Sequence, residues 1–435
     1  MRRLLYGKLK EWKNSPFRKP LLLDGARQVG KTWLLKEFGN KEYDSCAYIT
    51  CDRNKNILEL FDGNFDPQKI VTSLSVLSKT KIMPDKTLII LDEIQEAPAA
   101  ISSLKYFCEN CPEYHVAAAG SLLGIKTHQG TGFPVGKVNT LKLYPLSFME
   151  FLTATGNEML AEMVAAHHWS DTNPLSETLK GILKQYYFTG GMPEAVMAFA
   201  RGDAQDVRSI QKEILRNYSA DFSKHISSDE VPKTRLVWNS IPSQLAKENK
   251  KFIYSAIRKG ARAKDFENAI QWLSDAGLIH TVTKVKKIEK PLKFYEDFSC
   301  FKLFISDIGL LGAMSDTSEE DILLPDSTFT MYKGSFTEQY FAQQYLSATG
   351  GAPLFYYAND NSTSEIDFVF QNGNAYPCEV KAETNLRAKS MSTILKSSPN
   401  LKGLRFSMSG YKEQSNLTNI PLYLAEEYIK TVCSK

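Results

Sequence analysis

The sequence predicts an α/β protein of about three domains, beginning with a parallel sheet that helices cover on both faces. The chain has 435 residues, which is too long for a single ordinary core. Apolar, β-rich runs alternate with helical or polar segments over residues 1–150. This alternation is typical of a parallel sheet, because each crossover between parallel strands needs a connection the size of a helix. After Tyr144-Pro145-Leu146 the chain becomes mainly helical, and strand-like runs return towards its C-terminal end.

The first region, residues 1–150, contains the expected parallel sheet. Its strand-like runs lie at residues 21–24, 47–50, 88–91, 116–119 and 138–143. A Gly-rich turn follows the first run, and a segment with the apolar residues Leu34, Leu35 and Phe38 follows the turn. We therefore expect a strand, a turn and a helix at the start of this domain.

Three further regions follow, at residues 151–225, 226–295 and 296–435. Ser147 and Glu150 have the spacing of a capping box, which predicts that the helical region begins there. The next region predicts a helix with one apolar face, which Gly277 ends before strand-like alternation over residues 278–285. The last region predicts a helix and then strands at residues 354–357, 365–370 and 376–381, so its class is again α/β.

Composition and charge exclude few classes of function. Hydrophobic residues make up 43% of the chain and charged residues 23%, which is usual for a soluble protein. The basic N-terminus develops no apolar run like that of a signal peptide, and no stretch approaches the roughly 18 apolar residues that cross a bilayer. We therefore expect a cytoplasmic protein without a membrane partner. The formal net charge of +4 neither requires nor excludes a nucleic-acid partner.

Seven cysteines are scattered along the chain, which argues against a disulfide framework. Cys108 and Cys111 form one close pair, but a structural zinc site would need a second pair at similar spacing. Two half-buried thiols at the end of a helix are the simpler interpretation, and a redox role stays open.

A phosphate-binding loop follows the first expected strand. The residues Gly25-Ala26-Arg27-Gln28-Val29-Gly30-Lys31-Thr32 match the pattern G-x-x-x-x-G-K-[ST] in full. The glycines let the backbone wrap around phosphate oxygens, and the following helix adds its positive N-terminal end. Lys31 would reach the β- and γ-phosphates, and the Thr32 hydroxyl would ligate Mg²⁺. The motif predicts that ATP binds here with Mg²⁺.

Two acidic residues and a serine complete the predicted nucleotide site. The apolar run at residues 88–91 reads as a buried strand that ends in Asp92 and Glu93. Asp92 could hold Mg²⁺ through water, and Glu93 could polarise the attacking water. Ser121, at the end of the next strand, could hydrogen-bond the γ-phosphate or that water, although an ordinary turn serine is the alternative.

At this point the chain resembles a known family. It is similar to the AAA+ ATPases of bacteria and archaea whose C-terminal half carries an uncharacterised conserved domain, and the resemblance covers nearly the whole chain. The resemblance implies a P-loop NTPase core, a helical lid over residues 151–225, a winged helix over residues 226–295, and a sensor-1 role for Ser121. It rests on the phosphate-binding loop and on the segments LIILDEIQEAP (88–98), AGSL (119–122), LYPLSFMEFL (143–152), YFTGGMPEAV (187–196), KLFISDIGLL (302–311) and GSFTEQYF (334–341).

One position departs from the family pattern. Members of the family usually carry Gly-Arg before the segment at residues 143–152, and that arginine resembles an arginine finger. Here the dipeptide is Gly136-Lys137, and lysine keeps the charge but loses the planar, bidentate grip on phosphate. Hydrolysis is then expected to be slow, or another arginine, with Arg216 as a candidate, takes this part.

The C-terminal region carries a second group of charged residues. The alternating strand pattern puts Glu365 and Asp367 on one face, and Glu379 and Lys381 on one face of the next strand. With Glu338 on the preceding helix, the set resembles the PD-(D/E)xK nuclease superfamily, which implies a restriction-endonuclease-like domain over residues 296–435. By that resemblance Asp367 and Glu379 hold Mg²⁺, Glu338 completes the metal shell, and Lys381 orients or activates water. A solvated strand face with alternating charges is the alternative, and cleavage stays open.

Clusters of basic residues suggest DNA as a partner. Phosphate contacts from them would position the domain without reading sequence. They lie before and after the amphipathic helix that is expected within the region 226–295. The residues are Arg258, Lys259, Arg262, Lys264, Lys284, Lys286, Lys287 and Lys290.

The leading hypothesis is an ATP-dependent machine that acts on or near nucleic acid. The alternative is a nucleotide-controlled switch or adaptor that binds a protein partner and has an inactive C-terminal domain. A small-molecule kinase ranks last, because the pair Asp92-Glu93 suits activation of water better than activation of an acceptor. Since AAA+ relatives often assemble, an oligomer also stays open.

Overall fold

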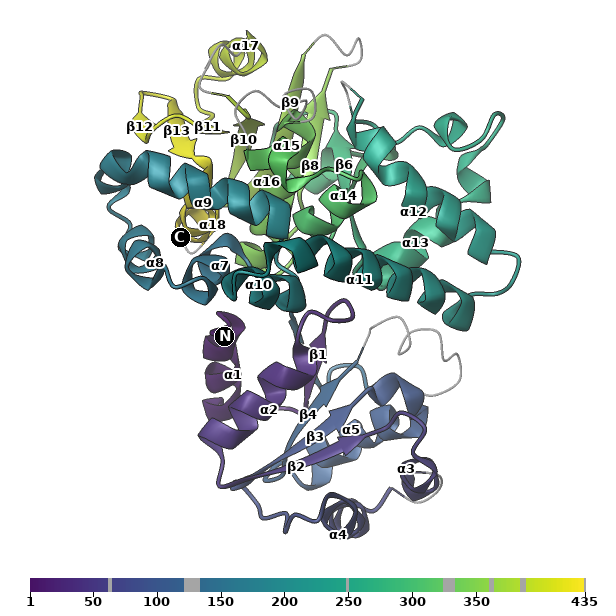
Figure 1. Ribbon diagram of the computed structural model, residues 1–435. Helices are drawn as coiled ribbons and strands as arrows, with labels where there is room; N and C mark the ends of the chain where they lie inside the picture. The colour runs from purple at the N-terminus through teal and green to yellow at the C-terminus, as the bar shows by residue number, and fades with distance from the viewer. Residues whose placement is uncertain are drawn as a thin grey trace. The chain divides into compact units, whose positions relative to one another are not determined.

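The computed structural model describes residues 1–61, 65–120, 134–247, 250–323, 333–359, 364–383 and 389–433 (Figure 1). The chain forms two compact units. The first comprises Met1–Tyr144 with Asp275–Gly277, and the second comprises Pro145–Ser274 with Leu278–Lys435.

The first unit is built on a five-stranded sheet in the order β2-β3-β4-β1-β5. All neighbouring strands are parallel, which confirms the parallel sheet predicted from the sequence. The strand β1 lies in the interior of the sheet, between β4 and β5. The strands are β1 (Leu21–Asp24), β2 (Ser45–Thr50), β3 (Thr87–Asp92), β4 (His115–Ala119) and β5 (Asn139–Lys142).

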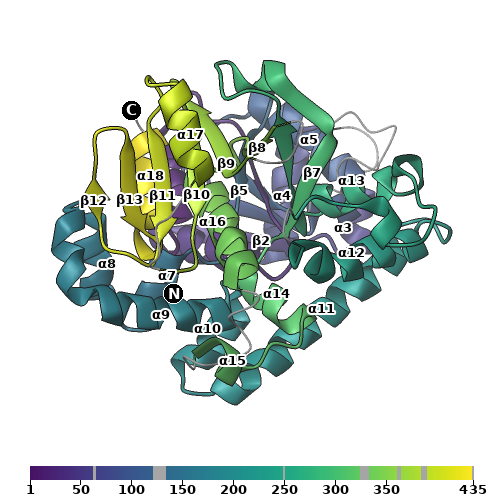
Figure 2. The same ribbon diagram turned by 90° about the horizontal axis from the view of Figure 1, so that it is seen from above.

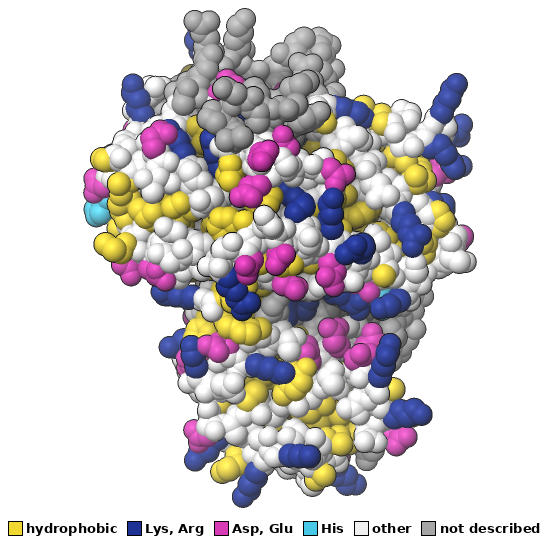
Figure 3. All heavy atoms as spheres, viewed as in Figure 1, with side chains coloured by type: hydrophobic (Ala, Val, Ile, Leu, Met, Phe, Trp, Pro, Cys, Tyr) yellow, Lys and Arg dark blue, Asp and Glu magenta, His cyan; other side chains and the backbone are white. Residues whose placement is uncertain are grey.

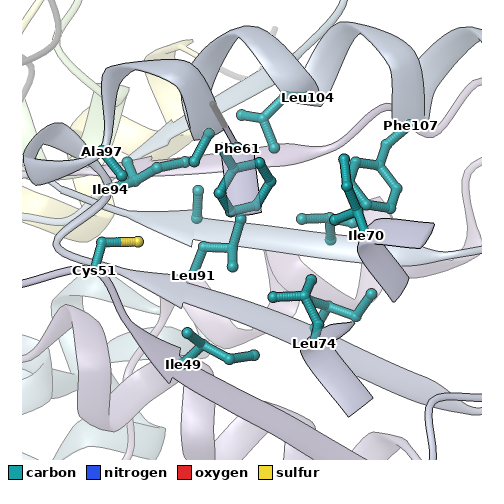
Figure 4. Close-up of a cluster of buried hydrophobic side chains, with 14 of the residues drawn as sticks. Ile49, Cys51, Phe61, Ile70, Leu74, Leu91, Ile94, Ala97, Leu104 and Phe107 are labelled. Atoms are coloured by element: carbon teal, nitrogen blue, oxygen red, sulfur yellow. The ribbon is translucent and has the colours of Figure 1, made fainter. Parts of the chain in front are cut away.

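Helices cover both faces of this sheet, which explains why β1, β3 and β4 are buried along their whole length. On one face, α3, α4 and α5 pack on alternate strand residues such as Leu91, and Figure 4 shows Phe61, Ile70 and Phe107 in this core. On the other face, Phe38 of α2 packs edge-on against Tyr6 of α1, with ring centroids 5.5 Å apart. The helices are α1 (Leu5–Asn14), α2 (Lys31–Glu42), α3 (Lys55–Phe61), α4 (Pro67–Ser78), η1 (Ile94–Glu96) and α5 (Pro98–Asn110).

The second unit begins with helices. The predicted capping box is present at the start of α7, where the Ser147 hydroxyl accepts from the Glu150 amide at 3.3 Å and the Glu150 carboxylate accepts from the Ser147 amide at 3.0 Å. The α-helices before the first strand are α7 (Phe148–Ala154), α8 (Glu158–Ala165), α9 (Ser176–Thr189), α10 (Pro193–Ala200), α11 (Ala204–His225), α12 (Val231–Leu245) and α13 (Glu267–Asp275). Short 3-10 turns accompany them, η2 (Trp169–Leu175), η3 (Tyr254–Ala256) and η4 (Ala263–Asp265).

An eight-stranded mixed sheet follows, in the order β12-β13-β11-β10-β9-β8-β6-β7 (Figure 2). The antiparallel hairpin of β6 and β7 joins the C-terminal strands through a parallel pairing of β6 with β8. The sheet therefore includes strands on both sides of residue 296, where the sequence predicted a domain boundary. The strands are β6 (Ile279–Val285), β7 (Glu296–Ile305), β8 (Phe355–Ala358), β9 (Glu365–Asn372), β10 (Asn374–Val380), β11 (Gly403–Ser407), β12 (Lys412–Glu413) and β13 (Leu417–Pro421).

The helix α16 is the central helix of this unit and is buried from Ser335 to Leu346. Three of its glutamines form hydrogen bonds with the backbone of other elements. Gln339 bonds to the strand β7, Gln343 bonds to the helix α14, and Gln344 bonds to the helix α7. Gln343 also donates to Asp307, a buried residue that caps α14. The remaining helices are α14 (Ile308–Met314), α15 (Glu319–Leu323), α16 (Lys333–Thr349), α17 (Lys389–Ser397) and α18 (Ala425–Cys433), with turns η5 (Leu292–Tyr295) and η7 (Leu422–Leu424).

No helix within the described ranges is both long enough and apolar enough to span a membrane.

Candidate functional site

The predicted phosphate-binding loop connects β1 to α2 in the first unit. Gly25 has φ +148° and Gly30 has φ +94°, which are conformations that side chains rarely allow. A Cβ at Gly25 would lie 2.2 Å from the carbonyl oxygen of Leu143, the residue that follows β5. The helix begins at Lys31 directly after Gly30, so its N-terminal amides belong to the loop. These features suit the phosphate binding that the sequence predicted for this loop.

Lys31 folds along the inside of this loop. Its Nζ donates to the carbonyl oxygens of Gly25 at 2.7 Å and Ala26 at 2.9 Å. Burial lowers the pKa of the Lys31 ammonium, and the carboxylates of Glu93 and Asp24 oppose that shift. The ammonium therefore lies between the loop carbonyls and the acidic ends of two strands, where a phosphate would replace the carbonyls as its partner.

Asp92 is the acceptor for three donors at the end of β3. Its Oδ2 accepts from the Thr32 hydroxyl at 2.8 Å and from the Tyr48 hydroxyl at 2.9 Å, and its Oδ1 accepts from the Glu93 amide at 3.1 Å. Hydroxyl and carboxylate oxygens are the hard donors that Mg²⁺ prefers. The Thr32 and Asp92 oxygens are already within hydrogen-bonding distance of each other, so this donor set fits the Mg²⁺ predicted from the sequence.

Glu93 adopts an unusual backbone conformation beside Asp92. Its φ is +51°, in the left-handed region that residues other than glycine seldom occupy and that is enriched at functional sites. Gln95 donates from Nε2 to the Glu93 carboxylate at 2.5 Å and is itself buried. The conformation and the hydrogen bond together fix the direction of the carboxylate that was predicted to activate water.

Three residues of this site were missed by the sequence analysis: Arg3, Tyr48 and Gln95. Arg3 is buried and donates to the carbonyl of Val29 in the loop at 2.8 Å and to the carbonyl of Tyr144 at 2.6 Å. No motif marks Arg3 or Tyr48, because each reaches the site from a distant part of the chain. Gln95 stands two residues after Glu93, so its proximity to the acidic pair was the one available signal.

Of the residues predicted to assist hydrolysis, the structure describes Lys137 in the first unit and Arg216 in the second. Lys137 pairs with Glu109 of the same unit, with Nζ and Oε1 at 2.9 Å. Arg216 is exposed on α11 and lines a cavity of about 570 Å³ within the second unit, together with Arg235. Ser121 lies outside the described residues.

The two thiols of the Cys108/Cys111 pair are free. They lie at the C-terminal end of α5, and burial raises the pKa of the Cys111 thiol.

The second predicted site lies in the second unit, where β9, β10 and α16 meet. Asp367 accepts from the amide of Val380 at 2.8 Å, which ties β9 to the end of β10. Glu379 pairs with Lys381 at 3.1 Å and with Arg405 at 3.4 Å. The Glu338 carboxylate on α16 acts electrostatically on both Asp367 and Lys381. The structure therefore brings the four predicted residues into one neighbourhood.

Two lysines that the sequence analysis did not place in the cluster lie among its carboxylates. Lys302 on β7 is 1% exposed, and its Nζ lies 2.6 Å from Glu365 and 3.7 Å from Glu338. Lys250 contacts the other oxygen of Glu338 at 2.5 Å. Burial by itself would lower the pKa of Lys302, but Glu338 and Glu365 outweigh it and raise the pKa above its ordinary value. Lys302 is therefore a buried cation that stays charged.

This charge arrangement does not fit a metal held by three carboxylates. In the described part of the chain, no group of three or more His, Cys, Asp or Glu residues is placed to hold a metal ion. Burial and the nearby Glu338 raise the pKa of Asp367 to about 7, so this carboxyl is partly protonated near neutrality. Four carboxylates and four cations make up the neighbourhood: Glu338, Glu365, Asp367 and Glu379 with Lys250, Lys302, Lys381 and Arg405. A lysine inside the otherwise apolar run 300–305 was a signal for a buried ion pair, since lysine is seldom buried without a partner.

Comparison with known families supports the assignment of the first unit. Residues 17–152 match an AAA domain, so this part of the chain is an AAA-type P-loop ATPase domain, a class that binds nucleotide, generally with Mg²⁺. Residues 180–321 match a domain of unknown function (DUF8612), and residues 333–424 match another domain of unknown function (DUF4143). No curated protein matches the chain.

Several solved structures resemble the chain at low identity. The Walker-type ATPase PABY2304 of Pyrococcus abyssi is 16% identical, with 72% of this chain and 95% of that chain covered and a TM-score of 0.45. The Orc1 protein of Aeropyrum pernix in complex with DNA is 13% identical, with 73% and 93% covered and a TM-score of 0.29. Cdc6p from Pyrobaculum aerophilum is 14% identical, with 72% and 92% covered and a TM-score of 0.25. At these TM-scores the likenesses do not establish a shared arrangement of the whole chain.

Proposed function

We propose that this protein hydrolyses ATP with Mg²⁺ at the loop of residues 25–32 and acts on or near nucleic acid. The observation that carries the ATPase part is the position of Asp92. One of its oxygens accepts from the Thr32 hydroxyl of the phosphate-binding loop, and its backbone continues directly into Glu93. This joins the residues for phosphate binding, metal binding and water activation within one domain that matches the AAA family.

The residues have distinct parts in the proposed reaction. The amides of the loop and Lys31 bind the phosphates, and Thr32 and Asp92 hold Mg²⁺. The metal, when bound, neutralises charge on the phosphate oxygens. Glu93 accepts the proton of the water that attacks the γ-phosphorus, and Gln95 keeps the Glu93 carboxylate oriented. A bond forms from the water oxygen to the γ-phosphorus as the bond from that phosphorus to the β-phosphate oxygen breaks. ADP and inorganic phosphate leave, and Glu93 releases its proton to solvent or to the phosphate.

The nucleic-acid part of the proposal is supported by exposed cations in the second unit. Arg258, Lys259, Lys286, Lys287 and Lys290 are all exposed. On the face in Figure 3, Lys and Arg side chains are interspersed with Asp and Glu, and the net charge of the whole chain is only +4. A local cluster, rather than the charge of the whole chain, would therefore bind phosphates.

ATP turnover by the purified protein, measured with and without DNA, tests this proposal. We expect DNA to accelerate turnover, and Lys31→Ala and Glu93→Gln to abolish it. Lys41→Ala is the matched control, since Lys41 lies on the same helix and pairs with Glu37 away from the loop. Tight ATP binding with no turnover under either condition would reject the proposal in favour of a nucleotide-controlled switch.

For the second site, the buried Lys302 favours a C-terminal domain that does not cleave nucleic acid. One observation favours cleavage instead: the Oε2 atom of Glu338 is buried and has no hydrogen-bond donor among the described residues. Incubation with plasmid and Mg²⁺ or Mn²⁺ separates these functions. We expect no cutting, whereas cuts that vanish in Lys381→Ala would establish a nuclease.

A further inference from the structure

The β6–β7 hairpin of the second unit exposes two phenylalanines. Phe294 in η5 is 83% exposed, and Phe298 in β7 is 76% exposed. Their neighbours point inwards: Leu292 is 1% exposed and packs in a core cluster with Val285, and Tyr295 packs against the same cluster. The hairpin is therefore anchored by some apolar side chains and presents the two phenylalanines to solvent.

A break in strand pairing places Phe298 outside the ladder. Thr283 pairs with Phe301, but the next residue, Lys284, pairs with Asp297. Three residues of β7, 298–300, therefore have no partner on β6. Such bulges redirect side chains and are usually retained for a purpose.

The same hairpin carries four exposed lysines close in sequence to the two phenylalanines. Lys286, Lys287, Lys290 and Lys293 are exposed, and among the described residues none of them forms an ion pair with a carboxylate. The acidic residues of the hairpin accept from hydroxyl groups instead. Glu289 accepts from Tyr295 at 3.1 Å, Glu296 from Thr283 at 2.6 Å, and Asp297 from Ser299 at 2.6 Å. Lys290 donates to the neutral Asn374 side chain at 3.3 Å, and the Nζ of Lys287 lies 5.8 Å from the Tyr295 ring centroid. Neither contact neutralises a charge, so the lysines can still attract an external anion.

We propose that this hairpin binds nucleic acid with unpaired bases, and that Phe294 and Phe298 stack on those bases while the lysines contact the phosphates. Aromatic side chains exposed within a basic surface are the arrangement by which proteins hold single strands, because every base has a face that can stack. In a duplex the bases already stack on each other, so the phenylalanines would add nothing unless the duplex opened. This inference rests on the proposed association with nucleic acid and specifies its substrate as single-stranded or locally unpaired.

A membrane surface is the competing partner for aromatic and basic residues together. Membrane binding scales with a continuous buried apolar area. The exposed large apolar side chains of the hairpin are Phe294 and Phe298, and Tyr295, Glu296 and Asp297 separate them along the chain. The hairpin therefore suits individual bases better than an acyl layer.

Fluorescence anisotropy with the full chain tests the inference, with one labelled oligonucleotide used single-stranded and annealed to its complement. We expect Phe294→Ala and Phe298→Ala each to weaken single-strand binding about tenfold and to leave duplex binding unchanged. Phe17→Ala is the matched control, because Phe17 is 84% exposed in the first unit and should have no effect. Lys286→Ala with Lys287→Ala should weaken both forms and reduce the dependence of affinity on salt.

The outcomes separate this inference from the proposed function. If the protein binds DNA and neither phenylalanine substitution changes the affinity, the stacking role is overturned and the proposed association with nucleic acid is unaffected. No binding to either form, together with ATP turnover indifferent to DNA, would reject both. Binding to phosphatidylserine vesicles that is lost in the double phenylalanine variant, without oligonucleotide binding, would assign the hairpin to a membrane.

Discussion

Replacing Lys302 with methionine removes the buried cation of the second unit at nearly constant side-chain volume. In the native protein its ammonium lies 2.6 Å from Glu365 and 3.7 Å from Glu338. Breaking a buried ion pair by removing one partner typically costs about 3–5 kcal/mol, because the other charge stays buried and uncompensated. We therefore expect Lys302→Met to lower the free energy of unfolding of the second unit by about 3–5 kcal/mol at about pH 8.

The difference in the free energy of unfolding between the native protein and Lys302→Met should shrink as the pH falls. Burial raises the pKa of Asp367 to about 7, above its unfolded value, so the folded state binds a proton that the unfolded state has released. Stability therefore falls as the pH rises from about 4 to about 7. Lys302 lowers the pKa of Asp367, so its removal raises that pKa further and extends the same trend to higher pH. The variant should be closest to the native protein at about pH 5, where the Asp367 carboxyl is protonated in both folded proteins.

Urea unfolding followed by tryptophan fluorescence measures this effect. Lys293→Met is the matched control, since Lys293 is exposed and should change stability by less than about 0.5 kcal/mol. Adding Glu365→Gln to Lys302→Met should restore part of the loss, because it removes the charge of the carboxylate that lay 2.6 Å from the Lys302 ammonium. A loss below about 1 kcal/mol that does not vary with pH would refute the view of Lys302 as an internal counter-ion.

Three further predictions concern the first unit. Tyr48→Phe removes one of the donors to Asp92, so ATP turnover should fall several-fold with little change in stability. Steady-state kinetics and thermal unfolding measure these two effects, and unchanged turnover would exclude a role for this hydrogen bond. Arg3→Ala should cost about 1–3 kcal/mol of stability and weaken nucleotide binding, because two buried carbonyl groups lose their donor. Calorimetric titration with ATP measures the nucleotide affinity, and an affinity equal to that of the native protein would contradict this prediction. Gly25→Ala should abolish ATP binding, because its Cβ would lie 2.2 Å from the Leu143 carbonyl, and a variant that still binds ATP would show that the loop can rearrange.

The first unit was predictable where its signals are local. The loop of residues 25–32 and the pair Asp92-Glu93 each stand at the end of an apolar run, so motif and strand indicate each other. Arg3 and Tyr48 could not be found in this way. Arg3 contacts Tyr144, 141 positions away, and Tyr48 reaches Asp92 only because β2 pairs with β3.

The second unit was predicted less completely, because its sheet combines distant segments. The alternation of residues 278–285 indicated a strand, but nothing in that run indicates a partner near Phe355. The charged set on β9 and β10 was recognised from its spacing, whereas Lys302 enters the cluster from β7. A pattern within one segment shows which face a residue occupies, but the charge opposite that face depends on the tertiary fold.

The glutamines of α16 have a consequence for how the second unit opens. Gln339 both donates to and accepts from the backbone of Ile305, Gln343 and Gln344 accept from the backbone amides of Ile308 and Phe148, and all three glutamines are buried. Pulling any of these elements away would leave buried amide groups without partners, which is costly. The amides of α7, α14 and α16 should therefore exchange with deuterium as one cooperative group, at a single opening free energy, and none of these helices would fray on its own.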